Sequence, residues 1–264
     1  MTAQGKVAVA GADVGTECVK VVVLDAEHNL IGRAIVPTRG YFEDCIQEAT
    51  AIALTEAQLA ASELRAICAT GFGAACAAVA SLSMSETACH ARGALFRSHG
   101  PLTVVDIGGR DPKVITVDAG GGITAVHNVR KCAVGIGTFL MFAARHLDVH
   151  PTRLMDLATS AEKPARVGSY CSIFAEVEVI DLLRSGVSAN EIALGCMHSI
   201  AERILEMGGI APPLLVTGGV CEYFPGVITA LAERSGFAVE VAKEPILAGA
   251  LGAALFALDS VAAK

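Results

Sequence analysis

The order of predicted secondary structure repeats along this chain of 264 residues, and the repeat limits the folds that it can adopt. β-Branched runs and helically spaced apolar residues indicate strand, strand, strand, helix, strand, helix twice over. In the first copy we expect strands at residues 6–10, 19–24, 30–36 and 64–70, and helices at 42–61 and 85–99. In the second copy we expect strands at 102–107, 113–117, 123–129, 213–217 and 238–241, and helices at 133–147, 151–159, 172–185, 189–207, 223–235 and 245–259. The sequence therefore predicts an α/β protein built by internal duplication.

The duplication predicts two lobes. We place the first at residues 1–98 and the second, enlarged by helices, at 99–264, with the boundary near 98–101. The first three strands of each lobe are expected to be adjacent and antiparallel. The last helix, 245–259, is expected to pack back on the first lobe.

Composition excludes several classes of protein. The chain is 53% hydrophobic with no Trp, so its core must be aliphatic. A net charge of -7 argues against a nucleic-acid partner, because phosphate backbones select basic surfaces. The apolar stretch at 246–258 is shorter than a membrane span, and the N-terminus does not have the pattern of a signal peptide. Nine cysteines, an odd number, indicate reduced thiols in a cytoplasmic protein rather than a disulfide framework.

An acidic, glycine-containing turn follows the first strand of each lobe, at 11–16 in the first lobe and at 106–111 in the second. Backbone N–H groups in such turns can face a phosphate, because glycine lets the main chain approach closely. The residues expected to do so are Gly15, Thr16, Gly108 and Gly109. Neither a P-loop nor a dinucleotide fingerprint occurs, so a different nucleotide fold is indicated.

Other side chains complete this predicted nucleotide site. Asp13 and Asp106, at strand ends, would bind Mg²⁺ directly or through water, because Mg²⁺ prefers oxygen ligands. Lys20 lies on the second strand and can point back at a phosphate. Gly218 and Gly219, after a late strand, offer a flat approach for adenosine.

Two cysteines stand out from the other seven because each precedes a helix-forming stretch. Cys132 and Cys171 lie 39 residues apart. A helix N-terminus stabilises negative charge and favours the thiolate form that binds metals. The two cysteines are therefore candidate metal ligands.

These motifs resemble a known group of proteins. Residues 11–16 with Lys20, and residues 106–113, look like the two phosphate motifs of the acetate kinase/sugar kinase/Hsp70/actin superfamily. Residues 131–137 and 171–180 resemble one branch of it, which contains the ATP-dependent activators of 2-hydroxyacyl-CoA dehydratases and the ATPase subunits of benzoyl-CoA reductases. The resemblance implies duplicated ribonuclease H-like lobes, the actin-like ATPase fold.

The resemblance also implies a chemistry. In this branch a [4Fe-4S] cluster lies between two subunits, and each subunit supplies two cysteines, here Cys132 and Cys171. ATP binding and hydrolysis reorient the helices beside the cluster, and one low-potential electron passes to the acyl-CoA reductase or dehydratase component. The implied cofactors are ATP, Mg²⁺ and the cluster. A ferredoxin or flavodoxin is the implied electron donor, and the second subunit is either identical or a paralogue.

Two further residues have alternative interpretations. Glu176 can face Mg-ATP as an electrostatic or water-orienting group, or it can be a surface or capping carboxylate. Arg110 stands where many relatives have Gln, and it either touches a phosphate or forms an ion pair with Asp111.

Three functions are compatible with the sequence. The first is the ATPase that donates electrons. The second is a small-metabolite kinase of the same superfamily, although the chain is short for one. The third is a non-catalytic dimer bridged by zinc, which also accepts four thiolates.

Overall fold

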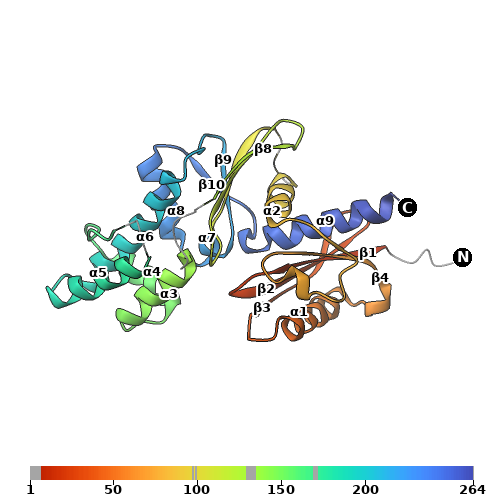
Figure 1. Cartoon of the computed structure of the whole chain (residues 1–264), viewed down its shortest axis with the longest axis horizontal. Coiled ribbons are helices and arrows are strands. Elements are labelled where there is room, and N and C mark those ends of the chain that lie inside the picture. Colours follow the sequence, from red (N-terminus) through yellow and green to blue (C-terminus); the bar gives the residue numbers. More distant parts are fainter. Residues whose placement is uncertain (1–6, 97, 99, 129–134, 169–171, 264) are drawn as a thin grey trace, which may run out of the picture. The chain divides into compact units, whose positions relative to one another are not determined.

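The structure, a computed structural model, describes residues 7–96, 98, 100–128, 135–168 and 172–263. The described chain forms two compact units. One comprises the residues up to Gly100 together with those from Leu247 onward, and the other is Pro101–Ile246. Each unit contains a five-stranded mixed sheet and its own helices (Figure 1).

The sheet of the first unit has the order β3-β2-β1-β4-β5. Its strands are β1 (Ala8–Val14), β2 (Cys18–Asp25), β3 (Leu30–Pro37), β4 (Leu64–Thr70) and β5 (Leu82–Ser83). The predicted antiparallel arrangement of the first three strands is confirmed, and β4 runs parallel to β1. Its helices are α1 (Phe42–Ala57), α2 (Glu86–Leu95) and α9 (Ala248–Ala262), with short 3₁₀ turns at Ala61–Glu63 and Ala74–Cys76.

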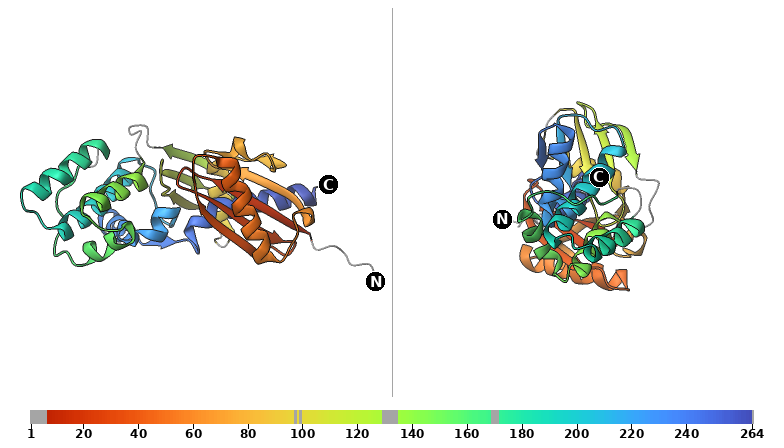
Figure 2. Two further views of the ribbon diagram at one scale, coloured as in Figure 1. Left: turned by 90° about the horizontal axis from the view of Figure 1, so that it is seen from below. Right: turned by 90° about the vertical axis from the view of Figure 1, so that its left-hand side faces the viewer.

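Strand β1 is buried along its whole length because helices cover both faces of the sheet. In Figures 1 and 2, α1 lies on one face of these strands and α9 on the other. Alternation along a strand sends Ala8, Ala10 and Ala12 into the cluster with α1. Gly11 faces α9, where an added methyl group would lie 2.1 Å from the backbone oxygen of Ala250.

The close approach of α9 explains one wrong prediction. We expected the first strand to end at residue 10 and a turn to begin at Gly11. The strand continues to Val14, because Gly11 gives the helix backbone room instead of bending the chain. The hairpin turn follows at residues 15–17.

Helix α9 and the 3₁₀ turn Pro245–Leu247 before it together form the one described helical segment that is long and apolar enough to cross a membrane. The window Pro245–Ala262 has 18 residues and a mean hydropathy of 1.7, and 67% of it is buried. The expectation that this region is too short is therefore wrong on length, because the helical segment exceeds residues 246–258 at both ends. A core helix passes the same test, and α9 packs against α2, β1 and β4.

The sheet of the second unit repeats the topology of the first. It has the order β10-β9-β6-β7-β8, with β6–β7–β8 antiparallel and β6–β9–β10 parallel. Its strands are β6 (Leu102–Asp106), β7 (Lys113–Val117), β8 (Ile123–Asn128), β9 (Leu214–Thr217) and β10 (Val239–Val241). The order third, second, first, fourth and fifth strand thus occurs in both sheets, as an internal duplication requires.

Helices enlarge the second unit as predicted. They are α3 (Ile136–His146), α4 (Leu154–Thr159), α5 (Ser172–Arg184), α6 (Ala189–Glu206), α7 (Gly219–Tyr223) and α8 (Pro225–Ser235), with a 3₁₀ turn at Pro151–Arg153. A further 3₁₀ turn, Pro245–Leu247, spans the boundary between the two units. Side chains of α3, α4, α6 and α8 share one aliphatic cluster with β6, β7 and β9. The long helix α6 packs against α4 and α8, so these helices form a continuous core with the sheet.

Candidate nucleotide-binding site

The first predicted acid, Asp13, lies near the end of β1 and is only 3% exposed. The antiparallel ladder places it opposite Lys20 of β2, and Lys20 Nζ donates a hydrogen bond of 3.1 Å to Asp13 Oδ2. A buried carboxylate needs such a partner, because desolvation of an isolated charge is costly. The strand register alone therefore brings together two of the predicted site residues.

A glycine borders the other oxygen of this carboxylate. Strand β4 places Thr70 beside Asp13, and the next residue, Gly71, has a φ of +88°. A methyl group at Gly71 would lie 2.6 Å from Asp13 Oδ1 and 2.7 Å from the backbone oxygen of Val14. Only glycine fits this backbone conformation and this space.

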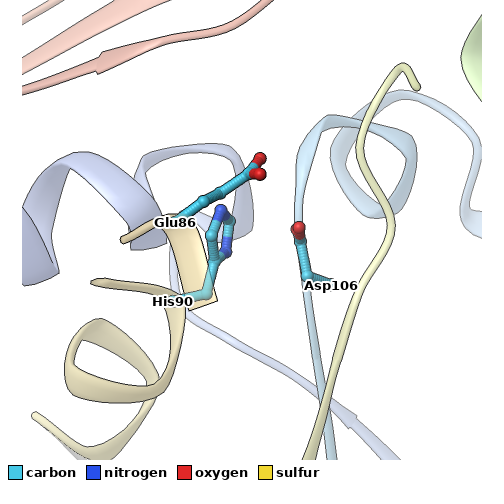
Figure 3. Close-up of side chains that lie close together, drawn as sticks. All are labelled: Glu86, His90 and Asp106. Carbon is cyan, nitrogen blue, oxygen red and sulfur yellow. The ribbon is translucent and has the colours of Figure 1, made fainter. Parts of the chain in front are cut away.

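The second unit repeats this arrangement, called the frame below, of an aspartate, a lysine opposite it and a Thr-Gly pair on the neighbouring strand. Asp106, 2% exposed, ends β6 (Figure 3), opposite Lys113 of β7 and beside Thr217 of β9. Gly218 follows with a φ of +98°, and a methyl group there would lie 2.7 Å from Asp106 Oδ1. Each unit thus has an aspartate at the end of its first strand, a lysine opposite, and a Thr-Gly pair on the neighbouring parallel strand.

Four residues of this frame were not predicted from the sequence as site residues, namely Thr70, Gly71, Lys113 and Thr217. The signal that could have found them is the Thr-Gly dipeptide that ends an apolar strand in each copy. It becomes evident only when the two copies are aligned on their aspartates.

The turn after β1 uses some of its polar groups internally. The Gly15 N–H donates to the Cys18 carbonyl at 3.1 Å, and the Gly15 carbonyl accepts from Thr38 Oγ1 at 2.8 Å. This amide closes the hairpin, and the predicted approach of the Gly15 N–H to a phosphate stays a prediction. Thr16, at the tip, is partly exposed.

The turn after β6 is fastened to a helix. The first N–H groups of α3 donate to it, Ile136 to the Arg110 carbonyl at 3.3 Å and Gly137 to the Gly109 carbonyl at 3.0 Å. A methyl group on Gly135 would lie 2.0 Å from the Gly109 oxygen, so glycine is required for this approach. The side of Gly108 is open, with no atom within 4 Å of an added methyl group.

Arg110 forms an ion pair with Asp111, with Arg110 Nε 3.4 Å from Asp111 Oδ2. Nearly half of the Arg110 side chain is exposed. The geometry agrees with the ion-pair alternative for this residue.

The late glycine pair is also engaged. The Gly218 N–H donates to the Pro245 carbonyl at 2.8 Å, and Gly219 begins α7. Their predicted contact with adenosine stays a prediction.

Glu176 lies on α5 and contacts α3. Its Oε1 is 3.4 Å from Nε2 of His146, and the His146 ring stacks on Phe142 with centroids 5.3 Å apart. The described position therefore gives Glu176 a contact between the two helices that follow the candidate metal ligands.

The two candidate cluster ligands, Cys132 and Cys171, lie outside the described residues. Helix α5 begins at Ser172, directly after Cys171 in the sequence, and α3 begins at Ile136.

Other cysteines are buried in the described chain. Burial raises the pKa of the Cys196 thiol to about 12 and raises the pKa of Cys221, whose thiol donates to the Thr217 carbonyl at 3.0 Å. These thiols are packing groups, because the reactive thiolate is disfavoured.

A histidine and a glutamate from α2 were not predicted as site residues. Glu86 and His90 occupy successive turns of α2, with a carboxylate oxygen and a ring nitrogen within 4.8 Å (Figure 3). His90 is 3% exposed. A methyl group on Gly249 of α9 would lie 2.9 Å from His90 Nε2 and 3.0 Å from Asp13 Oδ2. His90 and Asp13 therefore meet at the same point on α9.

Comparison with known proteins places these features in a family. The family model for the BadF/BadG/BcrA/BcrD ATPases matches residues 10–257. The chain is 35% identical to the activator of lactoyl-CoA dehydratase of Anaerotignum propionicum over 96% of its own length and 98% of that protein. It is 33% identical to a benzoyl-CoA reductase subunit of Thauera aromatica, covering 94% of this chain and 92% of that protein.

A solved structure gives the same result. The activator of the 2-hydroxyisocaproyl-CoA dehydratase from Clostridium difficile with bound ADPNP superposes with a TM-score of 0.89 at 28% identity. The match covers 97% of this chain and 96% of that chain, and it confirms the predicted actin-like ATPase fold. The chain belongs to the BadF/BadG/BcrA/BcrD ATPase family.

Proposed function

We propose that this protein is an ATP-hydrolysing electron-transfer protein that activates an acyl-CoA dehydratase or reductase component. The observation that carries the proposal is the bonding of α3 to the turn at Gly109 and Arg110. Through it, a predicted phosphate turn is continuous with the helix that follows Cys132 in the sequence.

The nucleotide is Mg-ATP. The repeated frame supplies two buried carboxylates, Asp13 and Asp106, and oxygen ligands of this kind suit Mg²⁺. Gly71 and Gly218 keep the space beside each carboxylate free of side-chain atoms. The relative with bound ADPNP supports a nucleoside triphosphate as the ligand of this fold.

The electron carrier is a [4Fe-4S] cluster held by Cys132 and Cys171 together with two cysteines of a second subunit. When bound, the cluster supplies one-electron chemistry at low potential. The start of α5 at Ser172 puts helix N–H groups next to Cys171 in the sequence, and these groups favour a thiolate.

In this proposal, the positions of α3 and α5 depend on which nucleotide is bound. A shift of the turn at Gly109 moves α3, because two backbone hydrogen bonds and the close approach of Gly135 join them. The contact of His146 with Glu176 joins α3 to α5. Glu176 thus acts as a link between these two helices.

The partner is the component that acts on the acyl-CoA. The lactoyl-CoA dehydratase activator and the benzoyl-CoA reductase subunit are similar over nearly the whole chain, and both support an acyl-CoA enzyme as partner. A ferredoxin or flavodoxin supplies the electron, and the second subunit is an identical chain or a paralogue.

Anaerobic purification followed by iron, sulfide and zinc analysis tests the proposal. We expect about four iron and four sulfide per two chains, with ATP turnover. Cys132→Ala and Cys171→Ala should each lose the iron, whereas the matched control Cys76→Ala, at an exposed cysteine, should keep it. A colourless protein with stoichiometric zinc, full iron in either variant, or phosphate transfer to a metabolite would contradict the proposal.

A further inference from the structure

His90 is a buried polar group for which the sequence motifs give no role. It lies on α2 at 3% exposure, in a helix that packs against α9. A buried histidine needs polar surroundings, because burial of an unsatisfied polar group is costly. Its surroundings include Glu86 one turn earlier on α2 and the edge of Asp13 that faces Gly249.

Asp13 and His90 both approach Gly249, a residue that has no side chain. A methyl group on Gly249 would be 2.9 Å from His90 Nε2 and 3.0 Å from Asp13 Oδ2, and these side chains are its nearest neighbours. Both atoms therefore rest against the backbone of α9. Any larger residue at 249 must push one or both of them away.

Asp13 is held from two layers of the first unit. From within the sheet, Lys20 donates to Oδ2 at 3.1 Å. From the helical layer, His90 Nε2 and the same Asp13 oxygen both lie within 3.0 Å of the position that a methyl group on Gly249 would take. A carboxylate fixed from both sides has a smaller range of orientations than one held by a flexible lysine alone.

We propose that His90 is a positioning residue for ATP hydrolysis, which acts by holding the Asp13 carboxylate against Gly249. The inference rests on the proposed function in one respect, namely that Asp13 faces the metal of Mg-ATP. His90 acts through Asp13, so its loss should lower kcat and raise the Mg²⁺ concentration for half-maximal turnover. The KM for ATP should change little.

Three glycine variants separate this role from a purely structural one. Gly249→Ala displaces only side chains, so it should keep the melting temperature and lower kcat by about 10- to 100-fold, the cost of a small misplacement. Gly252→Ala, on the same helix, would place a methyl group 1.8 Å from the Cys89 carbonyl oxygen and should disrupt folding. Gly40→Ala, in the same unit with open space around it, should leave both properties unchanged.

Substitutions at His90 complete the experiment. His90→Ala should lower kcat as Gly249→Ala does, and His90→Gln, which keeps a polar atom in a similar position, should recover part of it. Because the two residues act through one contact, the double variant Gly249→Ala/His90→Ala should be no slower than the worse single variant.

The outcomes are distinguishable from failure of the proposed function. Wild-type protein without ATP turnover would remove the proposed function itself. Wild-type turnover that persists unchanged in folded Gly249→Ala and His90→Ala would overturn this inference alone. Independent, multiplying effects in the double variant, or a fall in melting temperature that accounts for the lost activity, would also overturn it.

Discussion

Asp13 and Lys20 form a buried ion pair whose two members are 4% and 14% exposed in their side chains. Such a pair contributes little net stability when intact, because desolvation offsets the attraction. Removing one partner is different, since the remaining charge is buried without compensation.

Lys20→Met should therefore lower the free energy of unfolding of the first unit by about 3–5 kcal/mol. Lys163, whose side chain is 78% exposed and lies 3.7 Å from Glu191, is the matched control. Lys163→Met should cost about 0–1 kcal/mol, because solvent screens an exposed pair. Urea denaturation of both variants measures the difference, and equal losses would contradict the role given to burial.

At the residue scale, the sequence predicted both aspartates and Lys20 from their positions beside glycine turns. It did not predict that the Gly15 amide closes the hairpin, because the acceptor depends on the turn geometry. His90 was not predicted either, since its neighbour Gly249 is 159 residues away in the sequence and is only brought to it by packing.

Helix α9 and strand β1 approach each other closely enough that a side chain at position 11 has no room. This contact is a property of the pair of elements, because the atoms that would clash are backbone atoms of Ala250 and Ala254. Neither element can yield by changing a rotamer.

Gly11→Ala should therefore destabilise the first unit by about 3 kcal/mol or more, the upper range for overpacking. Chemical denaturation monitored by circular dichroism gives the free energy. A stability equal to that of the wild type would mean that α9 is free to move away from β1, contrary to the structure.

Local sequence predicted most elements correctly and some of their ends incorrectly. Ser85 caps α2 at the start of the helix predicted from residue 85, because its hydroxyl accepts the Ala88 N–H at 3.2 Å. The end of β1 was misplaced since Gly11 has the local signature of a turn and a tertiary role in packing. The predicted helix at 223–235 is confirmed from Pro225 onward, whereas α7 before it was not predicted.

At the scale of the molecule, the first unit is discontinuous in sequence. Its sheet is built from residues before Gly100, and α9, from residues after Leu247, packs against β1, β2 and β4. The aliphatic surface that α9 covers would otherwise face water.

A chain that stops after Ile246 should therefore have an unstable first unit. We expect it to accumulate as insoluble protein, or to exchange the amides of β1 and β4 rapidly in hydrogen-exchange measurements. A chain that stops after Ala262 keeps all of α9 and should behave as the full chain. Slow exchange in the shorter chain would show that the helix is dispensable.

The discontinuity also fixes an order of events at the ribosome. The second unit has all its residues available as soon as Ile246 has emerged, and it can then fold as a body. The strands of the first unit are synthesised earlier, but the face of their sheet that α9 covers stays exposed until the residues of α9 leave the ribosomal exit tunnel. The first unit, most of which is translated before the second, is therefore the last to complete its fold.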